Sequence, residues 1–153
     1  MREMKKITGL LMAMLLMLSA CGSVPLTGRK QVLLVSDQEV LSSSLTQYSD
    51  YMKSATKSSD KNESAMVTRV GKKIAAATEA YLKANGMESE IKNFQWEFNL
   101  VKDNQINAFC MPGGKIVVYE GLMSLVSSDD ELAVVVGHEV AHAVAKHSNE
   151  RMS

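Results

Sequence analysis

The segment GHEVAHAVAKH, residues 137–147, restricts the fold of this chain more than any other stretch. His138 and His142 stand four residues apart, and Glu139 directly follows the first histidine. On an α-helix, at about 100° per residue, the two imidazoles lie about 40° apart and one turn along, so both lean to the same side. This is the H-E-x-x-H spacing, in which two histidines hold a zinc ion and the glutamate serves as general base.

The spacing assigns His138 and His142 as zinc ligands and Glu139 as the catalytic residue. Zinc lowers the pKa of water bound to it, and Glu139 would take the proton of that water for attack on a scissile carbonyl. The alternative is a surface helix with scattered histidines. The apolar run LAVVV, residues 132–136, argues against that alternative because it predicts a buried helix. Ionisable groups on a buried helix are costly unless they coordinate something.

The third zinc ligand is missing from the motif. A catalytic zinc has three protein ligands, and the motif supplies two. If the helix continues to the last residue, His147 lies about 180° around the axis from the first histidine and points away. On the same helix, Glu150 lies too far along the axis. We therefore expect a chain truncated before the third ligand. The alternative is that a residue of the chain closes the site: Asp103, Glu97 or Glu120.

The first twenty residues have the order of a secretory signal. Basic residues precede an apolar run, residues 10–18, that is too short to span a bilayer, and small residues follow it. The sequence LSAC, residues 18–21, is typical of a lipobox, in which Cys21 is lipidated and becomes the mature N-terminus. An ordinary signal peptide cut near Ala20 is the alternative. Gly22 in place of an aspartate favours the outer membrane.

The charge balance excludes nucleic acid as a partner. The chain has 17 basic and 17 acidic residues, and removing residues 1–20 takes away three basic and one acidic, leaving 14 and 16. With Cys21 lipidated, Cys110 is the one remaining cysteine, so no internal disulfide can form. We expect the Cys110 thiol to be buried.

The order of predicted elements is typical of an α+β fold. Capping boxes at Ser36–Glu39 and Ser128–Glu131 mark two helix starts. Helical periodicity, strand alternation and turn residues predict the following elements: helices over 37–54 and 61–84, strands over 94–101, 106–111 and 115–119, and one long helix that runs from residue 129 through the H-E-x-x-H segment.

The stretches NAFCMPGGKIVVYEGLM and DDELAVVVGHEVAHAVAKHSNERMS resemble the HtpX-like and CAAX-prenyl-protease-like zinc metallopeptidases, metallopeptidase family forty-eight. In particular they are similar to its periplasmic lipoprotein branch. The resemblance covers residues 36–153 and implies a gluzincin site, whose third ligand is a Glu on a later helix. It implies a mostly helical zincin-type domain with a small antiparallel sheet and an active-site helix, truncated before the third-ligand helix.

The resemblance also implies a substrate-binding edge at Asn107, Ala108 and Phe109. An edge strand binds an extended peptide through main-chain hydrogen bonds, with little sequence preference. The alternative is an ordinary internal strand. The predicted organisation is a lipoprotein signal peptide over 1–20, a lipidated N-terminus and tether over 21–35, and the N-terminal part of a metallopeptidase domain over 36–153.

These features together predict a zinc-dependent endopeptidase of the bacterial cell envelope that cuts misfolded or damaged proteins. Its cofactor would be Zn²⁺ and its substrates unfolded polypeptides. A lipid on Cys21 would hold it to the membrane, on the periplasmic side. Two alternatives stay open: an assembly or chaperone-like binding factor for envelope proteins, and an inactive fragment that lacks the third ligand.

Overall fold

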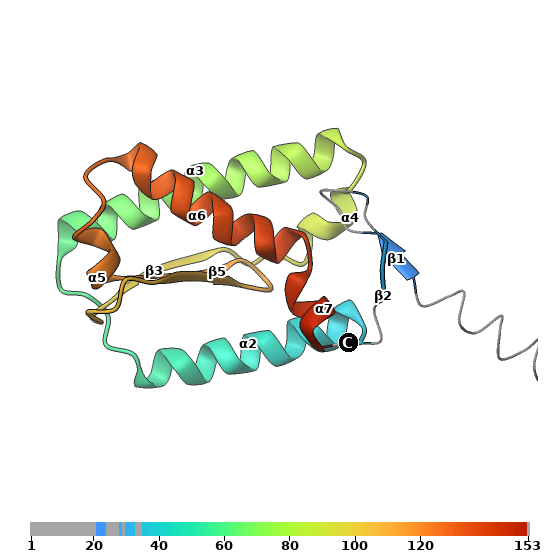
Figure 1. The fold of residues 1–153 in the computed structure, drawn as a ribbon, viewed down its shortest axis with the longest axis horizontal. Coiled ribbons are helices and arrows are strands. Elements are labelled where there is room, and N and C mark those ends of the chain that lie inside the picture. Colours follow the sequence, from blue (N-terminus) through green and yellow to red (C-terminus); the bar gives the residue numbers. More distant parts are fainter. Residues whose placement is uncertain (1–20, 24–27, 29, 33–34, 153) are drawn as a thin grey trace, which may run out of the picture.

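The computed structural model describes residues 21–23, 28, 30–32 and 35–152. Helices surround a small sheet in this part of the chain (Figure 1). The elements in chain order are β1 (Cys21–Ser23), β2 (Lys30–Val32), α2 (Asp37–Ser54), α3 (Lys61–Ala84), α4 (Glu88–Ile91), β3 (Glu97–Val101), β4 (Ala108–Met111), β5 (Lys115–Tyr119), α5 (Glu120–Met123), α6 (Asp129–Val144) and α7 (His147–Met152).

The sheet of β3, β5 and β4 lies between two helical layers, with α3 and α6 on one face and α2 on the other (Figure 1). Alternation along β3 sends successive side chains to the two faces. Phe98 and Leu100 join the core under α3 and α6, whereas Val101 packs beside Tyr48 of α2. In β5, Ile116 faces the layer of α3 and α6 and Val117 faces α2, so the central strand is buried on both faces.

The sheet is mixed, whereas an antiparallel sheet was predicted. The prediction is right for one strand pair and wrong for the other. β4 and β5 form an antiparallel hairpin, in which Ala108 pairs with Val118. β3 and β5 run parallel, in register from Glu97 opposite Lys115. The strand order is β3-β5-β4, because residues 102–107 carry the chain across before the hairpin begins. Alternation in the sequence predicts each strand but carries no information on which neighbour it takes.

Helix ends follow the predicted caps with one exception. At Ser36 the hydroxyl accepts from the Glu39 amide while the Glu39 carboxylate accepts from the Ser36 amide, a complete capping box. Ser128 likewise accepts from the Glu131 amide, but the Glu131 carboxylate accepts from the amide and hydroxyl of Ser127 instead. The second capping box is therefore only half formed, because its carboxylate reaches one residue further back.

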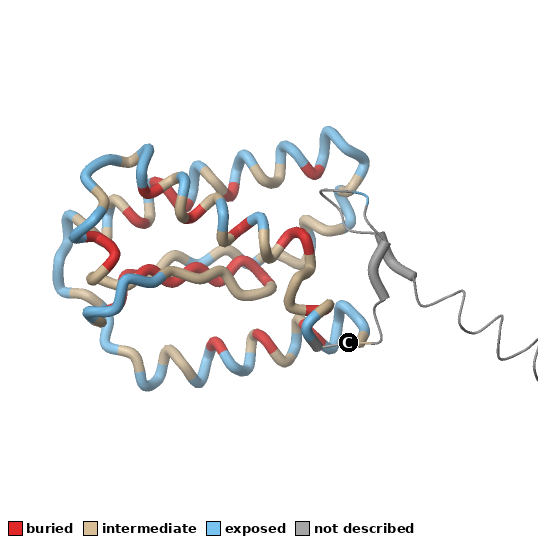
Figure 2. Tube along the Cα trace, in the orientation of Figure 1, coloured by how far each residue is buried: buried red, intermediate tan, exposed pale blue. Residues whose placement is uncertain are grey.

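The apolar stripe of α6 decides which side of this helix faces outward. Its buried residues lie at intervals of four: Leu132, Val136, Val140 and Val144. Figure 2 shows that α6 is buried along this side alone. The predicted burial of the whole LAVVV run is wrong, since Val134 is 75% exposed. Only the residues at helical spacing reach the core.

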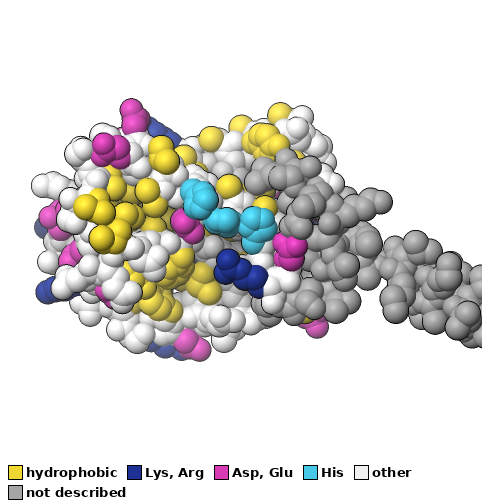
Figure 3. Space-filling view, in the orientation of Figure 1, with side chains coloured by type: hydrophobic (Ala, Val, Ile, Leu, Met, Phe, Trp, Pro, Cys, Tyr) yellow, Lys and Arg dark blue, Asp and Glu magenta, His cyan; other side chains and the backbone are white. Residues whose placement is uncertain are grey.

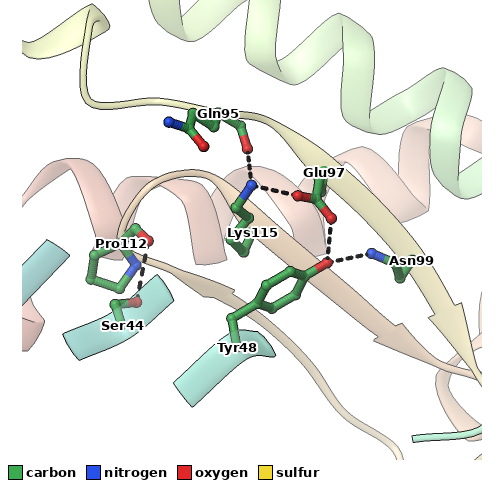
Figure 4. Close-up of polar contacts among 7 residues, drawn as sticks. All are labelled: Ser44, Tyr48, Gln95, Glu97, Asn99, Pro112 and Lys115. Atoms are coloured by element: carbon green, nitrogen blue, oxygen red, sulfur yellow. Dashed lines mark hydrogen bonds and ion pairs between the residues drawn. The ribbon is translucent and has the colours of Figure 1, made fainter. Parts of the chain in front are cut away.

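A polar network joins α2 to the sheet face that opposes it (Figure 4). The Lys115 ammonium, buried at the start of β5, donates to the Gln95 carbonyl and to the Glu97 carboxylate, both at 2.6 Å. The Tyr48 hydroxyl of α2 donates to the other Glu97 oxygen at 2.9 Å. The hydrogen bond from Lys115 lowers the pKa of Glu97 against the effect of burial, with a further contribution from Tyr48.

The N-terminal region contributes a short hairpin, in which Cys21 of β1 pairs with Val32 of β2. The predicted signal peptide lies outside the described residues, as does much of the predicted tether. Among the helices that the structure describes, none combines the length and the apolar character needed to cross a membrane.

A matched pair of glycine substitutions tests the packing of α3 on β3. A Cβ at Gly71 would lie 2.2 Å from Cδ1 of Phe98, whereas a Cβ at Gly137 would lie 3.8 Å from Cδ1 of Ile74. We expect Gly71→Ala to lower the free energy of unfolding by about 1–3 kcal/mol, because overpacking outweighs the better helix propensity. Gly137→Ala should raise it by up to about 1 kcal/mol. Urea denaturation measures both, and a stabilised Gly71→Ala variant would contradict the close packing.

A second prediction concerns Glu97 and pH. Its pKa is lowered in the folded chain, so its contribution to stability is complete above the ordinary value of 4.5 and is lost as pH falls through the folded value. We expect Glu97→Gln to lower the free energy of unfolding by about 1 kcal/mol at neutral pH, because the carboxylate is half exposed. The difference from the parent chain should shrink on acidification below pH 4.5.

Asp50→Asn is the control for this prediction, because Asp50 pairs with Lys53 on the exposed side of α2. Its effect on the free energy of unfolding should stay below about 0.5 kcal/mol. A Glu97→Gln difference that does not change with pH would show that the carboxylate is not held by Lys115 in its charged form.

Candidate active site

The two histidines of the H-E-x-x-H motif converge on the exposed side of α6. The Nε2 atoms of His138 and His142 lie 2.9 Å apart, and their ring planes cross at 85°. Val136 and Val140 fix this orientation. Each histidine follows one of these buried valines by two residues, which places it about 200° around the helix from the core.

His147 lies beside this pair, contrary to the prediction from a continuous helix. Its Nδ1 is 2.6 Å from Nδ1 of His142, and the two ring centroids are 4.8 Å apart. The three histidines form one row on the surface, drawn in cyan in Figure 3. The prediction was wrong because α6 ends at Val144 and α7 starts anew at His147, so the helical wheel does not extend across the break.

Lys146 makes the break between α6 and α7. Its φ of 56° lies in the left-handed region, which disfavours a side chain, and the chain turns there. The Lys146 ammonium donates to Asp37 at 2.5 Å and to Glu90 at 3.1 Å. Burial opposes the charge, but these two carboxylates outweigh it and raise the pKa of Lys146. The turn is therefore held to the start of α2 and to α4.

Glu139, the predicted general base, lies beside strand β4. It is half-buried, and its carboxylate is close enough to the Cys110 side chain to affect the thiol electrostatically. Burial and then this carboxylate raise the pKa of Cys110 to about 12. Cys110 is thus partly buried and un-ionised at neutral pH. The carboxylate next to His138 in the sequence is thus within electrostatic range of the outer strand of the sheet.

Strand β4 is an outer strand of the three-stranded sheet, paired on one side with β5. The Tyr119 amide donates to the Asn107 carbonyl, so Asn107 and Phe109 direct their main-chain groups toward β5. Antiparallel geometry alternates, so Ala108 and Cys110 direct theirs away from it. Of the three residues predicted to bind substrate, only Ala108 presents its backbone to the outer edge, and Cys110 adds a second outward position.

The donor set of α6 fits a zinc ion with a small adjustment. Tetrahedral coordination at 2.0–2.1 Å separates two nitrogen ligands by about 3.3 Å, which is a few tenths of an ångström more than the observed 2.9 Å. Within the described residues, no group of three or more His, Cys, Asp or Glu side chains is placed to hold a metal. Glu97, an alternative third ligand, is bound to Lys115 and Tyr48 instead.

His147 is the functional candidate that the sequence analysis misplaced. The sequence carries little signal of it, because the segment AVAKH has neither the glycine nor the proline that usually ends a helix. The turn is fixed by the ion pairs of Lys146 with Asp37 and Glu90, which precede it in the chain by 109 and 56 positions. Contacts at such separations cannot be read from local sequence.

Known proteins match this chain over the region of the site. The model of peptidase family M48 matches residues 61–153. The mitochondrial metalloendopeptidase OMA1 of Arabidopsis thaliana is 48% identical over 68 residues, which cover 44% of this chain and 14% of that protein. The mitochondrial metalloendopeptidase OMA1 of Homo sapiens is 29% identical over 130 residues, covering 83% of this chain and 24% of that protein.

A bacterial relative also matches. The β-barrel assembly-enhancing protease of Yersinia pestis is 38% identical over 52 residues, covering 34% of this chain and 11% of that protein. The chain thus spans at most 24% of the length of these three relatives. The family match covers more than half of the chain, which therefore belongs to peptidase family M48, a family of metal-dependent peptidases.

The environment of Cys110 gives a chemical test of the position of Glu139. A pKa near 12 leaves only about one thiol in 10⁴ ionised at pH 8. In a Cys21→Ser background, we expect Cys110 to react with a disulfide reagent at least about tenfold more slowly than an exposed thiol. Glu139→Gln should speed the reaction because it removes the nearby negative charge, whereas Asp130→Asn on the same helix should not. Equal rates in both variants would place Glu139 away from β4.

Proposed function

We propose that this chain carries the zinc-binding helix of an endopeptidase that cuts misfolded or damaged proteins in the bacterial cell envelope. The observation that supports it best is the convergence of two imidazole nitrogens, from His138 and His142, next to a carboxylate that borders an outer strand. These groups would supply two of the metal ligands, the base and the peptide-binding edge of a metal-assisted hydrolysis.

His138 and His142 would hold the ion through Nε2. When bound, zinc supplies an acidified water and polarises the scissile carbonyl. Glu139 accepts the proton of the attacking water and returns it to the leaving amine, which is the role of a general base that becomes a general acid. The half-buried position of Glu139 beside β4 supports this role, because a substrate on that strand would pass close to the carboxylate.

The outer edge of β4 would bind the substrate as an added strand. Ala108 and Cys110 offer outward main-chain groups, and such groups hydrogen-bond any peptide irrespective of its side chains. The side chains of these residues pack toward the α3 and α6 layer and are not needed for this pairing. Binding of this kind suits extended, unfolded chains, because a folded protein seldom presents a free strand.

The third zinc ligand in this proposal is a glutamate supplied from outside residues 1–153, as the family resemblance implies. Among the described residues, no group of three or more His, Cys, Asp or Glu side chains is placed to hold a metal. The lipid anchor at Cys21 and the outer-membrane location remain part of the proposal. They rest on the lipobox sequence, and the Yersinia pestis relative is named as a protease that enhances β-barrel assembly.

A second candidate is a binding factor for envelope protein assembly, in which cleavage is secondary. The name of the same bacterial relative, with that of a Vibrio cholerae relative, favours it, since both refer to β-barrel assembly. An outer strand that pairs with unfolded chains serves binding as well as cleavage.

Zinc content and cleavage of unfolded casein by the full-length gene product test the proposal. We expect bound zinc, and a loss of about 10²–10⁴-fold in kcat/KM in Glu139→Gln with zinc retained. His142→Ala should lose zinc as well as activity. Asp130→Asn, an exposed carboxylate exchanged for an amide on the same helix, is the matched control and should keep full activity.

Undiminished cleavage by Glu139→Gln, or a protein that binds no zinc, would overturn the proposal. Complementation separates the two candidate functions. If Glu139→Gln restores envelope assembly in a strain that lacks the protein, the binding factor is the better description. If it fails while the control variant succeeds, hydrolysis is required.

A further inference from the structure

We propose that His147 is a positioning residue for the metal site: it accepts a hydrogen bond from His142 and so holds that imidazole with Nε2 toward the ion. This inference rests on the proposed function, because it assigns His142 as a ligand. It concerns a residue outside the H-E-x-x-H motif, which reaches the site only because the helix breaks before it.

When the metal is bound, the number of protons on the two imidazoles allows only one hydrogen-bond direction between His142 and His147. A neutral imidazole carries one proton, so a histidine that ligates through Nε2 must carry it on Nδ1. Nδ1 of His142 lies 2.6 Å from Nδ1 of His147, and two nitrogens at this distance share a single proton. His147 must then be the acceptor, with its own proton on Nε2. A partner of this kind fixes both the tautomer and the ring orientation of a ligating histidine.

The same geometry excludes His147 as the third ligand in this arrangement. The nitrogen that faces His142 is occupied by the shared proton, and it faces Nδ1 of that ring. The metal side of His142 is the opposite nitrogen, Nε2, which converges with His138. His147 therefore supports the ligand from behind.

The fold holds His147 in place from both sides of the break. Before it, Lys146 is bound to Asp37 and Glu90. After it, the amide of Asn149, a residue that is only 4% exposed, donates to the other oxygen of Asp37 at 2.7 Å. Asp37 thus receives one contact from the turn and one from α7. Asp37 at the start of α2, with Glu90 of α4, thus fixes the segment that carries the acceptor.

The zinc affinity of the full-length gene product is the direct test, measured by competition with a chromophoric chelator at one fixed pH. Partners of this kind typically contribute about 10–100-fold to metal affinity, so we expect His147→Ala to weaken zinc binding by that factor. His147→Asn should restore most of the affinity, because an amide oxygen at that position accepts the same hydrogen bond. Arg151→Ala, an exposed residue on the same helix, is the control and should bind as the parent does.

Nitrogen-15 NMR of the zinc-bound chain gives a readout that a purely structural role would not affect. We expect Nδ1 of His147 to show the shift of an unprotonated acceptor. Thermal unfolding of each variant shows whether α7 is still folded. The inference is overturned by a protonated Nδ1 on His147, by unchanged affinity in His147→Ala, by equal losses in the Ala and Asn variants, or by a parent chain that binds no zinc.

The result of the His147 test can be distinguished from the result of the test of the proposed function. If His147→Ala weakens zinc binding and His147→Asn restores it, the positioning role is supported even where the full-length protein cleaves no unfolded substrate. In that case only the peptidase proposal fails.

Discussion

The burial of one face of α6 is the constraint on which the site depends. Leu132, Val136, Val140 and Val144 repeat every four residues and pack into the core shared with α3 and the sheet. A helix has only one orientation that buries such a stripe, so the residues about 200° away must face outward. His138 and His142 occupy those positions. The free energy of apolar burial, at about 25 cal/mol per Å², thus sets the direction of two polar side chains that take no part in the core.

The end of α6 is decided by charge. Lys146 takes a left-handed backbone conformation, which is unfavourable for residues with a side chain. Two carboxylates from distant elements offset this cost by binding its ammonium group. The ammonium is mostly buried, with 16% of its side chain exposed. A buried charge without partners would be costly, so the turn, the start of α2 and α4 depend on one another. The consequence is that His147 returns to the histidine pair.

The central and outer strands of the sheet differ in how far they are buried and paired. β5 is buried on both faces, and the network of Lys115, Glu97 and Tyr48 attaches α2 to it. β4, by contrast, has a partner strand on one side only among the described residues. The antiparallel register leaves the main-chain groups of Ala108 and Cys110 on the outer side. The proposed binding of an added peptide rests on this outer strand beside a buried central strand.

The sequence by itself determined the local structure and the chemistry of the motif. Helical periodicity and caps predicted α2 and α3 with their observed ends, and alternation predicted the strand that contains β3. The four-residue interval predicted that two imidazoles share a side of one helix. These features depend on residues a few positions apart, which is why they can be read from the chain.

Only the tertiary structure decided the rest. The parallel pairing of β3 with β5, the exposure of Val134, the outward positions on β4 and the return of His147 all depend on contacts between distant segments. Lys146 shows the reason most clearly, because the carboxylates that hold it come from the start of α2 and from α4. The segment AVAKH could either continue the helix or form a left-handed turn. The ion pairs of Lys146 with distant carboxylates stabilise the turn.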